Sequence, residues 1–257
     1  MLCSGPEWYD FLKFTPIDVP LECKLYGVHD DGLNNSKFIT IDPNDNFKVY
    51  LLSISLQNDV EALDIHPQTG VIYVASGKDT SKQGHLYQLN GQTGELTEIG
   101  ATGFQEIDGL SFAPDGSLWG WASGDGLVTI DTQSGKATIV AKYPGEVEDL
   151  TWNSDGTILY GVGNLSDGAP DAGMKLIAYD TTTGSLDTLC EAETFGQEIE
   201  ALDTLPDGSL VFGIHGKRNL TLGAINPETC KITAAQQITT DYNDIEGIAW
   251  PICQEKQ

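Results

Sequence analysis

The sequence predicts an all-β fold, a five-bladed β-propeller of four-stranded antiparallel blades whose ring is closed by the C-terminal strand. Three observations predict it. A short acidic motif recurs five times in the 257 residues, at intervals of about 40 to 52 residues. Each complete motif is followed by three further strand patterns, and the two chain ends supply the parts of a fifth blade. A repeat of this length suits a four-stranded propeller blade.

The motif predicts the first strand of each blade. Its pattern is acid, β-branched aliphatic, acid, small or acidic residue, then hydrophobic. It begins at Asp59, Glu106, Glu146, Glu198 and Asp244. A polar turn and a second apolar run follow the first four copies. Three of these turns contain Asp-Gly (Asp115-Gly116, Asp155-Gly156 and Asp207-Gly208). Asp-Gly between apolar runs is a strong hairpin signal, so the two runs predict paired strands.

The third and fourth strands are predicted by a second pair of apolar runs around a polar turn, as in HLYQLNGQTGELTEI and GLVTIDTQSGKATIV. Gly, Asn and Asp favour such tight connections. We therefore expect an N-terminal extension over residues 1–22 and one propeller domain over residues 23–257. The complete blades are expected at about 58–100, 105–142, 145–192 and 197–240.

The two ends of the chain predict a composite blade, made of residues 244–253 plus 23–57. The segment from Lys24 reads as second, third and fourth strands, and the segment from Asp244 reads as a first strand alone. Such an exchange leaves no open sheet edge. Cys23 and Cys253 both fall where the other blades carry their first tight turn, so we expect a disulfide between them. Cys3 is the competing partner for Cys23, and two buried thiols are the alternative.

The composition limits the partners of the chain. It has 38 acids against 13 bases, a formal net charge of −25. Such a surface repels nucleic acid and anionic membranes and attracts cations, although solubility in a salty or extracellular setting also explains acidity. No apolar run is long enough to cross a bilayer, so we expect neither nucleic-acid binding nor membrane insertion. A disulfide would indicate an oxidising compartment. We expect an extracellular or periplasmic protein whose signal peptide is not present in this sequence.

The second acid of each motif predicts a ring of carboxylates at one mouth of the central channel, because the first strand of a propeller blade lines that channel. The predicted metal ligands are Glu61, Asp108, Glu148, Glu200 and Glu246. Like charges this close raise one another's pKa unless a cation compensates them. Oxygen ligands in a roomy ring favour Ca²⁺. The alternative is that these acids serve the scaffold by accepting backbone hydrogen bonds.

A predicted ligand-binding face surrounds this ring. The first acid of each motif precedes the second by two residues and so lies on the same side of its strand. Asn164 and His215 directly follow second strands and should lie near the centre. The face thus comprises Asp59, Glu106, Glu146, Glu198, Asp244, Asn164 and His215. Trp8 and Tyr9, in the N-terminal extension, either plug one mouth or dock a partner.

The phrases Ile245-Glu246-Gly247-Ile248-Ala249 and Ile107-Asp108-Gly109-Leu110 resemble the first-strand motif of calcium-binding lactonase/gluconolactonase-type propellers and of esterase-like-phytase domains. The resemblance implies that an acid before Gly-Ile or Gly-Leu faces the channel, and that in the lactonase type this acid binds a metal. Glu246 is the best match and Asp108 the next. Those families have six blades where this sequence predicts five, so their catalytic residues are not carried over.

Three functions are compatible with the sequence. The first is a calcium-binding module for a carbohydrate or protein ligand, favoured because the acid ring looks uniform whereas catalysis needs unlike groups. The second is a metal-dependent hydrolase of an ester, phosphoryl or glycosidic bond at the channel mouth. The third is a structural or adhesive propeller without a ligand. Whether the chain is an enzyme is left open.

Overall fold

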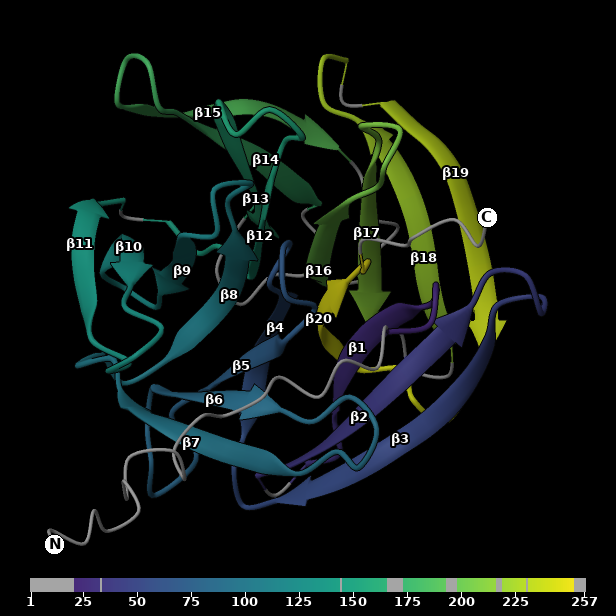
Figure 1. The fold of residues 1–257 in the computed structure, drawn as a ribbon. Coiled ribbons are helices and arrows are strands. Elements are labelled where there is room, and N and C mark those ends of the chain that lie inside the picture. The colour runs from purple at the N-terminus through teal and green to yellow at the C-terminus, as the bar shows by residue number, and fades with distance from the viewer. Residues whose placement is uncertain are drawn as a thin grey trace, which may run out of the picture.

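The computed structural model describes residues 21–32, 34–143, 145–165, 173–192, 198–215, 219–229 and 231–251. These residues form 20 strands and contain no helix. The strands make five four-stranded sheets, and every pairing within a sheet is antiparallel. Figure 1 shows the sheets arranged as a ring of five blades. The predicted five-bladed propeller is therefore confirmed.

The blades are numbered from the composite one, in which the C-terminal strand pairs with the first strand of the chain. Blade 1 has the order β20(Ile245–Ala249), β1(Leu25–Asp30), β2(Asn35–Asp42), β3(Lys48–Leu56). Blade 2 has the order β4(Val60–Ile65), β5(Ile72–Ser76), β6(His85–Leu89), β7(Leu96–Ala101). The predicted closure of the ring by the C-terminal strand is thus confirmed.

The remaining blades each come from one continuous stretch of chain. Blade 3 has the order β8(Ile107–Phe112), β9(Leu118–Ala122), β10(Gly126–Ile130), β11(Ala137–Ala141). Blade 4 has the order β12(Asp149–Trp152), β13(Ile158–Asn164), β14(Met174–Asp180), β15(Ser185–Ala192). Blade 5 has the order β16(Glu198–Thr204), β17(Leu210–His215), β18(Asn219–Asn226), β19(Lys231–Thr239).

Burial follows the position of a strand within its blade. The second strand β5 is buried at every residue, whereas β11, on the outer edge of blade 3, has none buried. The innermost strands contact their neighbours around the ring, from β4 to β8, β12, β16, β20 and back to β4. In Figure 1 these strands surround the centre and β3, β7, β11, β15 and β19 lie at the periphery. The near-continuous apolar runs of the inner strands reflect burial on both faces.

Five apolar cores hold the ring together, one at each seam between consecutive blades. At the seam of blades 2 and 3, for example, Tyr73 packs on Phe112 with ring centroids 5.1 Å apart. At the seam of blades 3 and 4, Trp119 packs on Trp152 at 5.2 Å. Such aromatic pairs add to the stabilisation that burial of their area gives. The blades are therefore fixed relative to one another by side chains on both sides of each seam.

Within the described residues there is no helix long and apolar enough to cross a membrane.

Candidate functional site

The second acid of each motif lies at the start of an innermost strand, so all five lie at the same end of the channel. Four are strand residues and Glu148 directly precedes β12. Their electrostatic influence runs from blade to blade: Glu61 and Glu148 raise the pKa of Asp108, and Glu200 raises that of Glu148. Glu200 and Glu61 both raise the pKa of Glu246, which completes the circle. The predicted carboxylates therefore meet at one mouth, called here the acid ring (Glu61, Asp108, Glu148, Glu200 and Glu246).

Burial makes the acid ring unfavourable as a set of five anions. Removal from water raises the pKa of Glu61 and of Glu148 to about 8 and that of Glu200 to about 7. Burial also raises the pKa of Asp108 and of Glu246 well above the ordinary range, with neighbouring carboxylates adding to it. Burial and like charge both disfavour the ionised form. The ring therefore takes up protons or a cation.

The acid ring is uniform on the first strands but not on the second strands beside it. A different residue stands at the mouth end of each second strand, either as its last residue (Asp30, Asn164 and His215) or directly after it (Gly77 and Ser123). Nδ2 of Asn164 donates to Oε1 of Glu148 at 3.2 Å, and the Ser123 side chain hydrogen-bonds to Asp108, which lowers the pKa of that carboxyl. Each carboxylate thus has its own neighbour. The five blades are chemically different at this mouth.

His215 supplies the positive charge on one side of the ring. Its Nδ1 lies 2.6 Å from Oδ1 of Asp244, 3.4 Å from Oε2 of Glu200 and 3.8 Å from Oε2 of Glu198. The hydrogen bond with Asp244, and then that with Glu200, raise the pKa of His215 to about 10. Nδ1 and oxygens of Glu198 and Glu200 are close enough together for a metal, but a protonated imidazole is not a ligand. On this side an internal cation balances the carboxylates.

The most crowded carboxylates of the mouth lie on the side of β20 away from His215, where β20 meets β1 and β4. Asp30, Asp244 and Glu246 each offer an oxygen within 4.8 Å of the others. Glu61 and Glu246 are hydrogen-bonded to each other, a contact that lowers the pKa of Glu61 and raises that of Glu246. Among the described residues the salt bridges at this mouth reach Glu106, Glu198, Glu200 and Asp244, and none reaches Glu61 or Glu246. Asp30, Glu61, Asp244 and Glu246 together are named here the carboxylate cluster.

Gly77 gives Glu61 the space that it occupies. A Cβ atom on Gly77 would lie 2.6 Å from Cγ of Glu61, 2.7 Å from its Oε1 and 2.9 Å from Oδ2 of Asp59. Real Cβ contacts are not this short, so any other residue would displace these carboxylates. The second-strand position that carries His215 in blade 5 is therefore empty in blade 2. No side chain at this position therefore contacts Glu61 as His215 contacts Glu200.

The first acids of the motifs have several roles. Oδ2 of Asp59 accepts a hydrogen bond from the amide of Asp79 at 2.6 Å, and Asp59 has a positive φ of 49°. Nζ of Lys78 lies 2.8 Å from Oε1 of Glu106. Glu146 raises the pKa of Glu148. These contacts show that Asp59 also serves the scaffold, and the ligand-binding face stays a prediction.

Three buried aspartates deeper in the channel were not predicted. Asp64 and Asp203 hold the next blade by accepting hydrogen bonds from the amides of Phe112 and Trp250. Asp149 does the same with the amide of Leu202 at 2.8 Å. Burial raises the pKa of all three. A repeat in the sequence could have identified two of them, because Asp64 and Asp203 each stand three residues after a ring acid.

Cys253 lies outside the described residues, so the predicted disulfide between Cys23 and Cys253 stays a prediction.

Solved structures with the same fold agree with this architecture. A propeller in the crystal structure of a nidogen/laminin complex has a TM-score of 0.60 and 10% identity, over 88% of this chain and 97% of that one. TolB from Acinetobacter baumannii has a TM-score of 0.56 and 13% identity, over 89% of this chain and 54% of that one. At these identities the likeness shows the fold alone.

No family model matches the sequence, and a sequence search of curated proteins finds no match.

Proposed function

We propose that the chain is a secreted or periplasmic propeller that binds Ca²⁺ at the carboxylate cluster and uses this channel mouth to bind a carbohydrate or protein ligand. One observation carries the proposal. Asp30, Asp244 and Glu246 bring oxygens within 4.8 Å of one another, Glu61 is hydrogen-bonded to Glu246, and His215 lies on the other side of Asp244. A cation at the cluster would replace the protons that burial otherwise forces onto these carboxyls.

The chemistry of these ligands favours calcium. All four residues offer carboxylate oxygens, which suit a hard cation, and Ca²⁺ accepts 6–8 oxygens in a flexible geometry. Zinc favours nitrogen or sulfur ligands. The imidazole that contacts the carboxylate of Asp244, that of His215, is held in the protonated form by Asp244 and Glu200. Waters or ligand hydroxyls would complete the shell, which is how a bound cation makes the mouth selective for oxygen-rich ligands.

Secretion is supported by independent features of the sequence. The formal net charge of −25 suits a protein exposed to salt. The predicted Cys23–Cys253 disulfide requires an oxidising compartment. Mapping disulfides in protein isolated from its native compartment tests this part separately from calcium binding.

Thermal unfolding of metal-stripped protein tests the calcium site. A ligand at 100 times its Kd that binds only the native state stabilises it by about 2.7 kcal/mol. We expect a saturable rise in Tm with CaCl₂ that NaCl of equal ionic strength does not give. Glu246→Gln should abolish most of this rise, whereas Glu95→Gln, on an outer turn, should leave it unchanged. No rise in the parent protein would contradict the proposal and leave the acids as scaffold.

A hydrolase is the second candidate, favoured by the unlike neighbours of the ring. Glu148, with its pKa raised to about 8, holds its proton more strongly than Glu200, whose pKa of about 7 is kept lower by the cationic His215. One protonated and one ionised carboxyl are what acid–base hydrolysis of a glycosidic bond needs. The test is turnover of ester, phosphoryl and glycosidic substrates. If turnover is lost in Glu148→Gln and in Glu200→Gln while Tm is preserved, the chain is a hydrolase and not only a binding module.

A further inference from the structure

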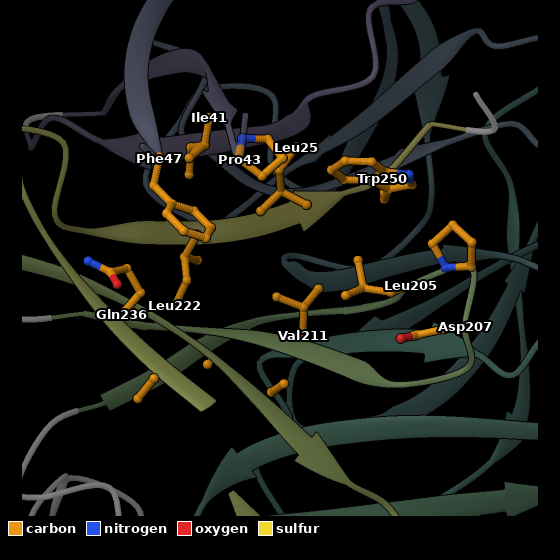
Figure 2. Close-up of a pocket in the computed structure, with 14 residues that line it drawn as sticks. Leu25, Ile41, Pro43, Phe47, Leu205, Asp207, Val211, Leu222, Gln236 and Trp250 are labelled. Carbon is orange, nitrogen blue, oxygen red and sulfur yellow. The ribbon is translucent and has the colours of Figure 1, made fainter. Parts of the chain in front are cut away.

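A cavity lies at the seam between blade 5 and blade 1, at the other end of the inner strands from the acid ring. Its volume is about 620 Å³. Figure 2 shows apolar side chains from both blades around it, and these include Leu25, Ile41, Phe47, Val211, Leu222 and Trp250. The apolar core of this seam, which includes Ile39, Ile245 and Ile248, packs beside the cavity. The seam with the cavity is also the one where the last complete blade meets the composite blade.

The cavity exists because one side chain of the repeat is small. Val211 pairs with Asp203 in blade 5, as Tyr73 pairs with Asp64 in blade 2 and Tyr160 with Thr151 in blade 4. At this position the other four blades carry an aromatic residue, and these are Tyr26, Tyr73, Trp119 and Tyr160. The valine therefore leaves empty the volume that an aromatic ring fills elsewhere.

Trp250 is the residue that this missing ring should contact. Trp250 occupies the same position in the repeat as Phe112 and Trp152, four residues after a ring acid. Phe112 packs on Tyr73 of the preceding blade, and Trp152 packs on Trp119 of the preceding blade. Among the described residues Trp250 has no aromatic partner. Ala224 and Ala235 continue the gap outward along blade 5. At this seam Trp250 is present, but Val211 stands where an aromatic ring would contact it.

We propose that residues 8–14 of this same chain, Trp-Tyr-Asp-Phe-Leu-Lys-Phe, dock in the cavity and supply the missing aromatic contact. The described chain begins at Leu21, only four residues before Leu25, which lines the cavity. Leu21 packs on the core at the other side of blade 1. Packed sheets are about 10 Å apart, and the seven residues from Phe14 to Leu21 span up to about 23 Å when extended. The segment therefore reaches the cavity across a single blade.

Composition and charge favour this segment as the occupant. It has four aromatic residues in seven, whereas the six residues that follow Pro251 contain one aliphatic side chain, Ile252. Asp207 is the charged residue of the cavity lining, and Lys13 stands between Leu12 and Phe14. An apolar segment with one central lysine complements an apolar cavity with one aspartate at its edge. Docking would strengthen the seam at which the two ends of the chain meet.

Photo-crosslinking in the full chain tests the contact directly. With p-benzoylphenylalanine in place of Phe11, we expect intramolecular crosslinks to peptides that contain Val211, Leu222 or Trp250. The same group in place of Thr132, on the polar outer side of blade 3, is the control. Val211→Tyr, which restores the ring found in the other blades, should reduce the crosslinks at least fivefold because it fills the cavity.

A fluorescent apolar dye, ANS, gives a second readout. In a variant with Trp8, Phe11 and Phe14 replaced by Ala, we expect ANS fluorescence to rise severalfold, and added Val211→Tyr should remove the rise. Asp10→Ala is the matched control within the segment. Crosslinks to other surfaces, or equal ANS binding in the parent and triple variants, would overturn the proposal. Crosslinks between two chains would overturn it in favour of a second copy, and an apolar compound that co-purifies with the parent protein and is displaced by Val211→Tyr would overturn it in favour of a small ligand.

Discussion

Nδ1 of His215 lies 2.6 Å from Oδ1 of Asp244, across the seam where the last blade meets the strand that closes the ring. On the other side of the same strand, Nδ1 of His29 lies 2.7 Å from the backbone oxygen of Asp244. Asp244 is thus held from both blades by histidines in opposite environments. The contact with Asp244 raises the pKa of His215 to about 10, whereas burial lowers the pKa of His29.

The stability of the ring closure should therefore fall at alkaline pH. The pKa of His215 is about 10 in the folded protein and about 6.5 when unfolded. Its stabilisation is fully present below about pH 6.5 and is lost as the pH rises toward 10. We expect His215→Gln to lower Tm at pH 6 more than at pH 10. His66→Gln, in the turn at the other end of blade 2 from the ring, is the control, and an NMR titration of His215 with a midpoint near 6.5 would contradict the argument.

Calcium should stabilise the protein more as the pH rises from 5 to 8. The raised pKa values of Asp30, Glu61 and Glu246 in the carboxylate cluster mean that the metal-free folded protein holds protons that the unfolded chain releases near pH 4. The metal-free protein thus loses stability through this range. Calcium has to displace those protons, so its affinity rises over the same range. The measurement is Tm with and without CaCl₂ at pH 5, 6, 7 and 8, and a calcium shift independent of pH would contradict it.

Gly77→Ala should weaken calcium binding. The new Cβ would lie 2.6 Å from Cγ of Glu61, so the side chain has to move away from Glu246. We expect at least a tenfold increase in the calcium Kd, which corresponds to about 1.4 kcal/mol, measured by calorimetry. Gly208→Ala is the control, because its φ of 83° strains the backbone while its Cβ meets nothing within 4 Å. It should lower Tm and leave the Kd unchanged.

The five-bladed ring was predictable because its signals are local and repeated. The motif acids and the Asp-Gly turns recur at a fixed place in the repeat, and the unpaired strand patterns at the two chain ends complete its fifth copy. The meeting of Glu61, Asp108, Glu148, Glu200 and Glu246 at one mouth follows from that repetition. What the sequence did not reveal is the unevenness of the ring. The acids repeat, but their neighbours come from the ends of other strands, where the sequence varies.

The prediction that a uniform acid ring disfavours catalysis rested on the motif alone. Alignment of the second strands would have placed Asp30, Gly77, Ser123, Asn164 and His215 at one structural position. The same comparison would have shown Val211 among aromatic residues. Both features are departures from a repeat, and a search for the repeat itself overlooks them. Pairing across the seams, as between His215 and Asp244, also depends on geometry that no local pattern specifies.

The disulfide between Cys23 and Cys253 stays a prediction, and peptide mapping without reduction is its test. We expect a linked pair of peptides that contain these two residues, with Cys3–Cys23 as the competing result. A bridge that closes a loop of about 230 residues stabilises by about 4–5 kcal/mol in the chain-entropy model. Cys253→Ser should therefore lower Tm under oxidising conditions and have little effect after reduction of the parent protein.

Asp203 should stabilise the ring closure, although burial of its carboxyl group disfavours the ionised form. It accepts hydrogen bonds from the amides of Trp250 and Thr204 and from Oγ1 of Thr151, so it joins blades 4, 5 and 1. Asp203→Ala removes this acceptor from the amides of Trp250 and Thr204, at about 1–3 kcal/mol for each buried donor left unpaired, whereas Oγ1 of Thr151 keeps its contact with Oγ1 of Thr204 at 2.9 Å. We expect a lower free energy of unfolding in urea, while Asp155→Ala, on an exposed turn, costs much less.

Asp203→Asn separates the hydrogen bonds of Asp203 from its charge. Burial raises the pKa of Asp203 to about 7, against about 3.9 in an unfolded chain. The folded protein therefore keeps a proton that the unfolded chain releases, and the aspartate lowers stability as the pH rises from about 4 to 7. Asparagine retains one acceptor and does not ionise. We expect the stability of Asp203→Asn relative to the parent protein to rise from pH 4 to pH 7, because only the parent loses stability as Asp203 ionises; a difference constant with pH would show that Asp203 is already ionised in the folded ring.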